Sequence, residues 1–270
     1  MNPILHKKNL FVFDMDGTIY LGGHPFPEAI HYINRLRNQG RRVLFFTNNS
    51  SRGADTYSRR LDKLGFSPQS GEILSSGDVT AEFLVRRRSG KRVFLVGTPD
   101  LERDFRTFGI HLISSDEAEA DIVVSSFDTT LTYDKLNAAC RYLHKGAEFL
   151  STNPDLNCPT EDGWMPDSGS IAALFTAATG KQPRFLGKPS RETLEMICEK
   201  TGTPPEDVCL FGDRLYTDIA LGRQNGVTSV LVLTGETTRE MLESTAQQNL
   251  PDLCCETLAD AEALTFGPDR

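Results

Sequence analysis

Short apolar runs recur along the chain and alternate with segments of helical periodicity. The runs are bounded by polar or turn-forming residues: Leu10–Phe13, Val43–Phe46, Val93–Val96, Ile122–Val124, Val208–Phe211 and Val230–Leu233. Continuous apolar strands that alternate with helices are buried on both faces, which is typical of a mostly parallel sheet in an α/β fold. Three expected helices stop at a glycine: residues 29–36 before Gly40, 54–64 before Gly65 and 193–198 before Gly202, the last with Ser190 placed to cap its start.

The middle of the chain breaks this simple alternation. Residues 80–182 have strand and helix signals of their own, whereas the polar residues that follow the strands gather before and after this segment. We therefore expect a core formed by residues 1–79 and 183–270, with residues 80–182 inserted as a second α/β domain. Within the insertion, Asn153–Pro166 has the proline and glycine content of a loop, and Trp164 is expected to be a packing residue.

Charge and cysteine usage restrict the partners and the compartment. The chain has 37 acidic residues against 29 Lys and Arg and no basic patch, so duplex nucleic acid and anionic membranes are not expected partners. Its first apolar run, Leu10–Phe13, is too short for a signal peptide, and no stretch reaches the length of a membrane span. The six cysteines form no C-x-x-C pair, which disfavours a zinc site or a disulfide framework. These features predict a cytoplasmic protein.

Polar side chains follow several of the expected strands, at the edge where parallel sheets carry their chemistry. Asp14 and Asp16 lie two positions apart on an extended segment, so they project to the same side. The full set of candidates is Asp14, Asp16, Thr47, Asn48, Asn49, Lys188, Asp213 and Asp218. Four carboxylates crowded together could not all ionise unaided, and a bound phosphate would add to the repulsion. Mg²⁺, which takes oxygen ligands and shares its shell with phosphate, is therefore the expected cofactor.

The candidate residues take distinct roles in phosphate chemistry. Asp14 is expected to attack phosphorus and form an aspartyl-phosphate. Asp16 can remain protonated among like charges, protonate the leaving oxygen and later activate water. The other expected roles are binding of the phosphate oxygens by Thr47, Asn48, Asn49 and Lys188, completion of the metal site by Asp213, and orientation of water or Lys188 by Asp218.

The same residues carry a family resemblance. Asp14–Thr18 is similar to the D-x-D-G-T motif of haloacid dehalogenase-like hydrolases. Thr47, Lys188 and Gly212–Asp218 match the other three motifs of that superfamily in order. Thr47–Ser50 and Thr152–Asp155 further resemble its class IIA, p-nitrophenylphosphatase-type members.

This resemblance extends over roughly residues 10–235 and implies several properties of the protein. The fold would be a Rossmann-like, doubly wound parallel-sheet core with a mobile inserted α/β cap, and the activity that of a Mg²⁺-dependent phosphatase of small phosphate monoesters. The family's metal ligands correspond to the carboxylates of Asp14 and Asp213 and to the main-chain carbonyl of Asp16. Asn153 and Asp155 would contact the substrate.

Other functions stay open at this point. A phosphorylatable receiver module also combines acids, Thr and Lys, but it would need neither the insertion nor Asp16. A dehalogenase would need neither Asp16 nor Asp213, whereas a phosphomutase would keep every motif. Sugar and polyol phosphates, nucleoside monophosphates and p-nitrophenyl phosphate are all compatible substrates, and the inserted domain would offer a surface for a homodimer.

Overall fold

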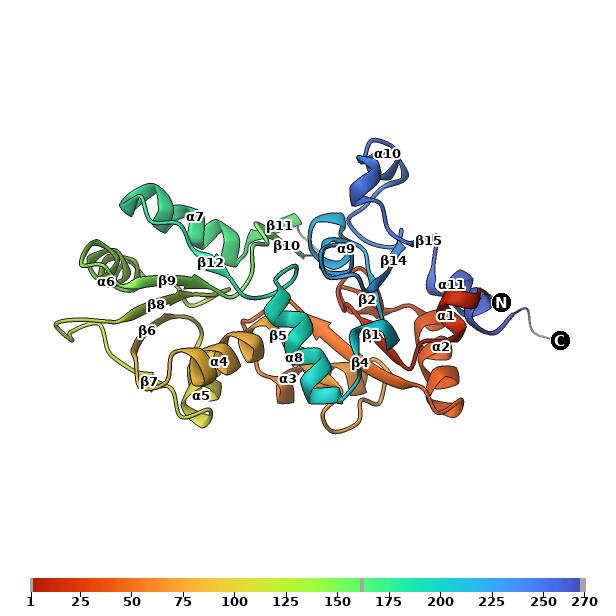
Figure 1. The fold of residues 1–270 in the computed structure, drawn as a ribbon. Helices are drawn as coiled ribbons and strands as arrows, with labels where there is room; N and C mark the ends of the chain where they lie inside the picture. Colours follow the sequence, from red (N-terminus) through yellow and green to blue (C-terminus); the bar gives the residue numbers. More distant parts are fainter. Residues whose placement is uncertain (1, 161–162, 268–270) are drawn as a thin grey trace. The chain divides into compact units, whose positions relative to one another are not determined.

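The computed structural model describes residues 2–160 and 163–267 and divides into two compact units (Figure 1). Unit 1 consists of Met1–Thr47, Tyr57–Leu74 and Lys188–Arg270, and unit 2 of Asn48–Thr56 and Ser75–Gly187. Among the described residues, no helix combines the length and the apolar character that crossing a membrane would require. Each unit has its own sheet and its own core, so each is described separately.

Unit 1 is built on a six-stranded sheet in the order β15-β14-β13-β1-β4-β5. Its strands are β1 (Leu10–Phe13), β4 (Arg42–Thr47), β5 (Ile73–Ser75), β13 (Val208–Gly212), β14 (Thr228–Val232) and β15 (Leu253–Cys255). The central strand β1 pairs in parallel with both β13 and β4, and Phe13 is in register with Phe211 and Phe45. The polar residues that follow these three strands therefore emerge at one edge of the sheet.

Helices cover both faces of this sheet. On one face, Phe13 stacks on Phe211 with ring centroids 4.8 Å apart, and both rings contact Tyr32 of α2 (Pro27–Asn38). On the other face, Val12 lies with Ile197 of α8 (Arg191–Thr201) and Leu221 of α9 (Ala220–Asn225) around a small cavity. Successive strand residues point to opposite faces, so the continuous apolar run of β1 is buried on both sides.

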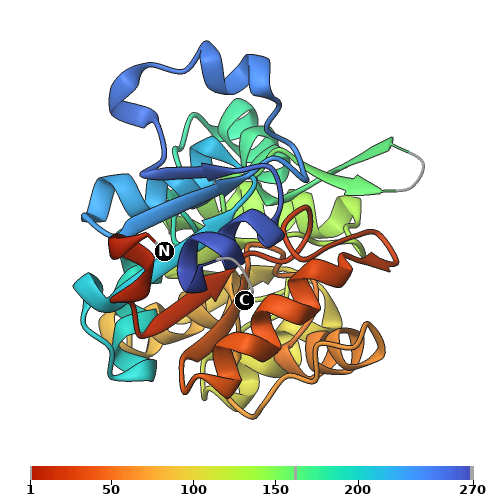
Figure 2. The ribbon, with the colours of Figure 1, turned by 90° about the vertical axis from the view of Figure 1, so that its right-hand side faces the viewer.

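The remaining elements of unit 1 lie outside the six-stranded sheet. Helix α11 (Leu258–Phe266) runs beside α2 in Figure 2, and the hydroxyls of Tyr32 and Thr265 lie 2.7 Å apart. Gly40, Gly65 and Gly202 have positive φ where the expected helices end, but Ser190 makes no capping hydrogen bond through its side chain. The other elements are α1 (Pro3–His6), β2 (Tyr20–Leu21), β3 (His24–Pro25), α3 (Ala54–Lys63, which begins in unit 2), η1 (Pro205–Asp207), η2 (Leu215–Ile219), α10 (Arg239–Glu243) and η3 (Gln247–Asn249).

Unit 2 contains a five-stranded parallel sheet in the order β12-β9-β8-β6-β7. The strands are β6 (Arg92–Val96), β7 (His111–Leu112), β8 (Ile122–Ser125), β9 (Glu148–Ser151) and β12 (Arg184–Phe185). The helices are α4 (Ser76–Arg87), α5 (Pro99–Thr107), α6 (Tyr133–His144) and α7 (Ser168–Thr179). Tyr142 of α6 and Phe175 of α7 pack with Phe94 and Phe149 of the sheet, so unit 2 has an apolar core of its own.

Two expectations for the inserted segment are wrong. Part of Asn153–Pro166 is an antiparallel hairpin of β10 (Asn157–Thr160) and β11 (Gly163–Pro166), not a loop throughout. Pro159 and Pro166 lack an N–H donor, which explains why this hairpin has a weak sequence signal. Trp164 is 61% exposed on β11 and is therefore not a core packing residue.

Candidate active site

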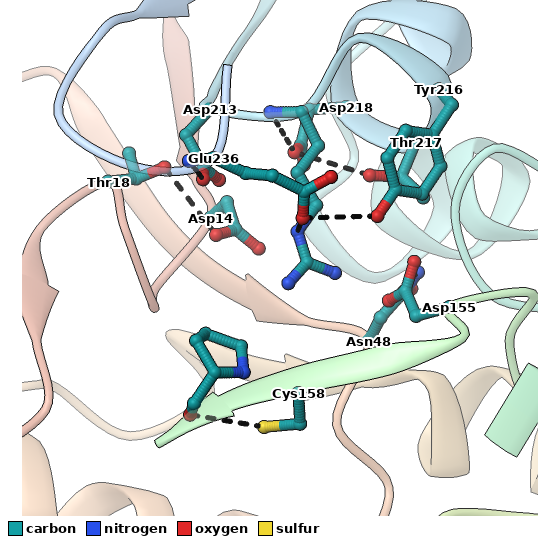
Figure 3. A network of polar contacts seen from close by, with 12 residues as sticks. Asp14, Thr18, Asn48, Asp155, Cys158, Asp213, Tyr216, Thr217, Asp218 and Glu236 are labelled. Atoms are coloured by element: carbon teal, nitrogen blue, oxygen red, sulfur yellow. Dashed lines mark hydrogen bonds and ion pairs between the residues drawn. The ribbon is translucent and has the colours of Figure 1, made fainter. Parts of the chain in front are cut away.

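Three aspartates lie together at the carboxyl edge of the sheet in unit 1. Asp14 directly follows β1, and its N–H donates to the carbonyl of Phe211 on the neighbouring strand. Asp213 directly follows β13, and Asp218 lies in the single turn of π-helix, η2, that comes next. Figure 3 shows these three side chains close to one another. Thr47, the last residue of β4, is buried at the same edge.

Lys188 joins two of these carboxylates. Its Nζ donates to Oδ1 of Asp14 at 2.5 Å and to Oδ1 of Asp218 at 2.6 Å. Burial acts to lower the pKa of Lys188, but the two aspartates outweigh it and raise the pKa, so the ammonium stays charged. Burial raises the pKa of Asp14 well above its usual value, while Lys188 opposes and Asp218 and Asp213 add to the increase. One lysine thus faces three carboxyl groups, so ionising all three in this buried site requires further positive charge.

Asp213 is enclosed by backbone. Its Oδ2 accepts the N–H of Glu236 at 2.6 Å, whereas its buried Oδ1 has no hydrogen-bond partner within the described residues. A Cβ added at Gly235 would lie 2.0 Å from this Oδ2, and one added at Gly17 2.5 Å. The close approach of these two glycines fixes the carboxylate in place. Burial, with the nearby charge of Asp218, raises the pKa of Asp213 to about 7.

The arrangement fits a divalent cation. One oxygen each from Asp14, Asp213 and Asp218 lie within 4.8 Å of one another. Buried carboxylate oxygens normally have a hydrogen-bond partner or bind a cation, and Oδ1 of Asp213 has no hydrogen-bond partner among the described residues. This oxygen is therefore suited to binding a metal ion. Asp218 belongs to this group in addition to its predicted contact with Lys188. Among the described residues, the carboxylate of Asp16 does not belong to this group of three. The predicted metal contact of Asp16 is made by its main-chain carbonyl, and that contact stays a prediction.

Asp16 has a different environment from the other acids. The hydroxyl of Tyr20 donates to its Oδ2 at 3.0 Å, and Nη2 of Arg60 lies 3.8 Å from its Oδ1. Burial raises the pKa of Asp16, while Arg60 and the hydrogen bond from Tyr20 partly offset the increase. A carboxyl group that keeps its proton more readily than usual is suited to protonating a leaving group.

The remaining predicted residues, Asn48, Asn49, Asn153 and Asp155, lie in unit 2. The amide of Asn48 donates to Oδ2 of Asp155 at 3.1 Å, a pair that Figure 3 shows, and the amide of Asn153 donates to the carbonyl of Asn48 at 2.7 Å. Asn49 forms a turn in which its Oδ1 accepts the N–H of Ser51. Their roles in binding phosphate or substrate stay predictions.

Sequence reasoning missed four residues that shape the site. Tyr20 and Arg60 contact Asp16, while Gly235 and the N–H of Glu236 hold Asp213. Arg60 and Gly235 are far in sequence from the acids they adjoin, so no spacing pattern links them. Tyr20, four residues after Asp16, could have been found only by expecting the tight turn in which the N–H of Gly17 donates to the carbonyl of Tyr20.

Comparison with known proteins adds independent evidence. The family model for haloacid dehalogenase-like hydrolases matches residues 11–111, and a second, HAD-hydrolase-like model matches residues 185–261. The acid sugar phosphatase of Staphylococcus saprophyticus is 34% identical over 233 residues, which are 86% of this chain and 89% of that protein. The chain belongs to the haloacid dehalogenase-like hydrolases.

Solved structures agree with this membership. The 4-nitrophenylphosphatase of Thermotoga maritima is 42% identical to this chain and has a TM-score of 0.91. The match covers 97% of this chain and 99% of the Thermotoga chain. The glycerol phosphate phosphatase of Mycobacterium tuberculosis, solved in complex with magnesium, is 30% identical to this chain and has a TM-score of 0.89. The match covers 96% of this chain and 77% of the mycobacterial chain. The predicted α/β fold class and the class IIA resemblance are confirmed. The hydrolase is an enzyme of the phosphoric monoester hydrolase class, which excludes a non-enzymatic receiver module.

Proposed function

We propose that this hydrolase removes phosphate from small monoesters through an aspartyl-phosphate on Asp14, with Mg²⁺ as its cofactor. The observation that carries the proposal is the group of Asp14, Asp213 and Asp218 around Lys188, in a chain of this family. Relatives named acid sugar phosphatase, 4-nitrophenylphosphatase and glycerol phosphate phosphatase support small, chemically varied leaving groups. Sugar and polyol phosphates come first among the candidates, followed by nucleoside monophosphates.

The first half of the reaction transfers the phosphoryl group to the enzyme. An oxygen of Asp14 forms a bond to phosphorus while the bond between phosphorus and the leaving oxygen breaks. Asp16 gives its proton to that leaving oxygen, so the product leaves as a neutral alcohol. Lys188, already bonded to Asp14 and Asp218, would bind an equatorial oxygen of the phosphoryl group together with Thr47.

The second half regenerates the enzyme. Asp16, now a carboxylate, takes a proton from water, whose oxygen attacks phosphorus and releases inorganic phosphate and Asp14. Mg²⁺ held by Asp14 and Asp213 would supply positive charge that offsets the repulsion between the phosphate and the carboxylates.

We further propose that unit 2 acts as the cap that selects the leaving group. All six cysteines lie within the described residues and none forms a disulfide, and we propose the reducing cytoplasm as the location of the protein.

The test is steady-state turnover on a panel of phosphate esters that includes p-nitrophenyl phosphate, glycerol phosphate, a hexose phosphate and a nucleoside monophosphate. Chelation should abolish phosphate release, and added Mg²⁺ should restore it. Reaction in ¹⁸O-labelled water should place the label in the released phosphate, as hydrolysis requires. Phosphate transfer between substrate molecules without label in inorganic phosphate would instead indicate a phosphomutase. Turnover that survives exhaustive chelation would contradict the metal assignment.

A further inference from the structure

Two residues outside the predicted set of site residues contact the carboxyl group of Asp16. Tyr20 has no solvent exposure, and its hydroxyl donates to Oδ2 of Asp16 at 3.0 Å. The phenolic hydroxyl is thus a buried hydrogen-bond donor aimed at this oxygen.

Arg60 holds this arrangement from a distant part of unit 1. Its guanidinium carbon lies 4.6 Å from the centre of the Tyr20 ring, and Nη2 donates to the carbonyl of Gly22 at 2.8 Å. The same nitrogen is 3.8 Å from Oδ1 of Asp16. The guanidinium of Arg60 thus stacks on the ring of Tyr20, hydrogen-bonds to the turn between β2 and β3, and faces the carboxyl group of Asp16.

The loop geometry makes the contact specific. The N–H of Gly17 donates to the carbonyl of Tyr20 at 2.8 Å, which closes a tight turn and returns the ring to Asp16. Because Oδ2 accepts the hydrogen of the Tyr20 hydroxyl, the acidic proton of Asp16 belongs on Oδ1. A free carboxyl group would exchange the roles of its two oxygens by rotation, and the hydrogen bond restricts this rotation.

We propose that Tyr20 and Arg60 are positioning residues that hold Asp16 so that Oδ1 delivers the proton to the leaving oxygen. This inference rests on the proposed role of Asp16 as the general acid. As the bond between phosphorus and the leaving oxygen breaks, its electron pair stays on that oxygen, which takes the proton from Oδ1. The carboxylate that remains faces the guanidinium of Arg60 and still accepts from Tyr20.

The test uses leaving groups of graded basicity, because a general acid matters most when the departing oxygen is strongly basic. The substrates are p-nitrophenyl phosphate, phenyl phosphate and glycerol phosphate. For Tyr20→Phe and Arg60→Met we expect kcat/KM, which covers the steps up to departure of the leaving group, to fall about 10- to 100-fold on glycerol phosphate. On p-nitrophenyl phosphate kcat/KM should fall less than about threefold. Asp16→Asn is the reference and should show the same order of substrates with larger losses.

Matched controls separate positioning from general stability. Tyr32→Phe removes another buried hydroxyl of unit 1, whose partner is Thr265, and Lys63→Met removes an exposed cation from the same helix as Arg60. Both controls should leave the dependence on the leaving group unchanged.

The outcomes distinguish this inference from the proposed function. If Asp16→Asn loses kcat/KM equally on all three esters, or loses none, the general-acid role itself fails. If Asp16→Asn shows the dependence and Tyr20→Phe and Arg60→Met do not, the positioning role is overturned. Uniform losses in these two variants, with a lowered melting temperature, also overturn it and assign them to folding of the hairpin.

Discussion

At the residue scale, the site is governed by an excess of negative charge. Lys188 donates to Asp14 and to Asp218, while Asp213 has a buried oxygen with no hydrogen-bond partner among the described residues. Burying carboxylates without compensation is costly, and replacing one by a neutral group can stabilise a protein even as it removes function. The chemistry of each aspartate can therefore be separated from its contribution to folding.

The nucleophile is tested by Asp14→Asn. The amide keeps the shape of the side chain and removes the attacking charge, so we expect kcat to fall by about three orders of magnitude or more. The melting temperature should be retained, because Lys188 keeps Asp218 as a partner. Rapid-quench detection of an acid-stable phospho-enzyme in the parent, absent from the variant, checks the assignment. Substantial steady-state turnover by Asp14→Asn would rule out Asp14 as the nucleophile.

Asp213 gives the metal-free protein a defined pH dependence. Its pKa is raised, chiefly by burial, from 3.8 to about 7, so in this pH window the folded protein binds more protons than the unfolded chain. The stability of the metal-free protein should therefore decrease as the pH rises through the window and level off above it. At about pH 8 without metal, Asp213→Asn should exceed the parent in stability by on the order of 2 kcal/mol, and this gain should shrink toward about pH 4.

Denaturant unfolding of parent and variant with chelator, at several pH values, measures this difference. Added Mg²⁺ should stabilise the parent but not Asp213→Asn. A stability difference that does not change with pH would show that Asp213 ionises normally in the folded protein.

At the element scale, two loops converge on one carboxylate. The loop after β1 contributes Gly17, with φ of +84°, and the loop after β14 contributes Gly235 and the N–H of Glu236. Thr234 further joins these loops through a hydrogen bond from its hydroxyl to the carbonyl of Gly17 at 2.6 Å. The position of Asp213 in the candidate metal site therefore depends on backbone that carries no functional side chain.

Gly235→Ala tests this dependence. Its Cβ would lie 2.0 Å from Oδ2 of Asp213, so the carboxylate must move. We expect the Mg²⁺ concentration for half-maximal activity to rise about tenfold or more, with the fold retained. Gly23→Ala is the matched control, because a Cβ there meets nothing within 4 Å. An unchanged Mg²⁺ requirement in Gly235→Ala would mean that the position of Asp213 does not limit metal binding.

At the scale of the whole molecule, the chain forms two compact units, each with its own sheet and its own core. The acidic cluster belongs to unit 1, and the segment that follows Thr47 belongs to unit 2 through the contacts of Asn48 with Asp155 and Asn153. We expect unit 2 to determine which esters are preferred, while unit 1 supplies the chemistry they share. A homodimer formed through unit 2 stays a prediction that light scattering can test.

The cap role is tested by comparing an exposed with a buried residue of unit 2. Trp164 is 61% exposed, so Trp164→Ala should keep the melting temperature. The ratio of kcat/KM for a preferred ester to kcat/KM for a poor ester should change about tenfold. Asn153 is fully buried and donates to the carbonyl of Asn48, so Asn153→Ala should lower the melting temperature as well. The measurements are thermal unfolding and kcat/KM on the ester panel. Equal losses by Trp164→Ala on every ester would remove it from substrate selection.

The sequence by itself determined the strands and pointed to the candidate aspartates at their ends. A run such as Leu10–Phe13 is apolar at every position because both faces of β1 are covered, and this local pattern needs no tertiary information. Asp14 and Asp213 were found because each directly follows such a strand, and parallel strands bring their carboxyl ends to one edge. The glycine stops of three helices were likewise local signals.

Only the tertiary structure decided how these residues are supported. Arg60 reaches Tyr20 and Gly235 reaches Asp213 through contacts between segments remote in sequence, and no periodicity or spacing encodes such contacts. The same holds for Trp164, whose aromatic character predicted burial although it lies exposed on a hairpin. Local sequence determines which backbone a segment prefers and which face is apolar. The environment of a single side chain depends on which remote segments pack against it, and folding of the whole chain determines that packing.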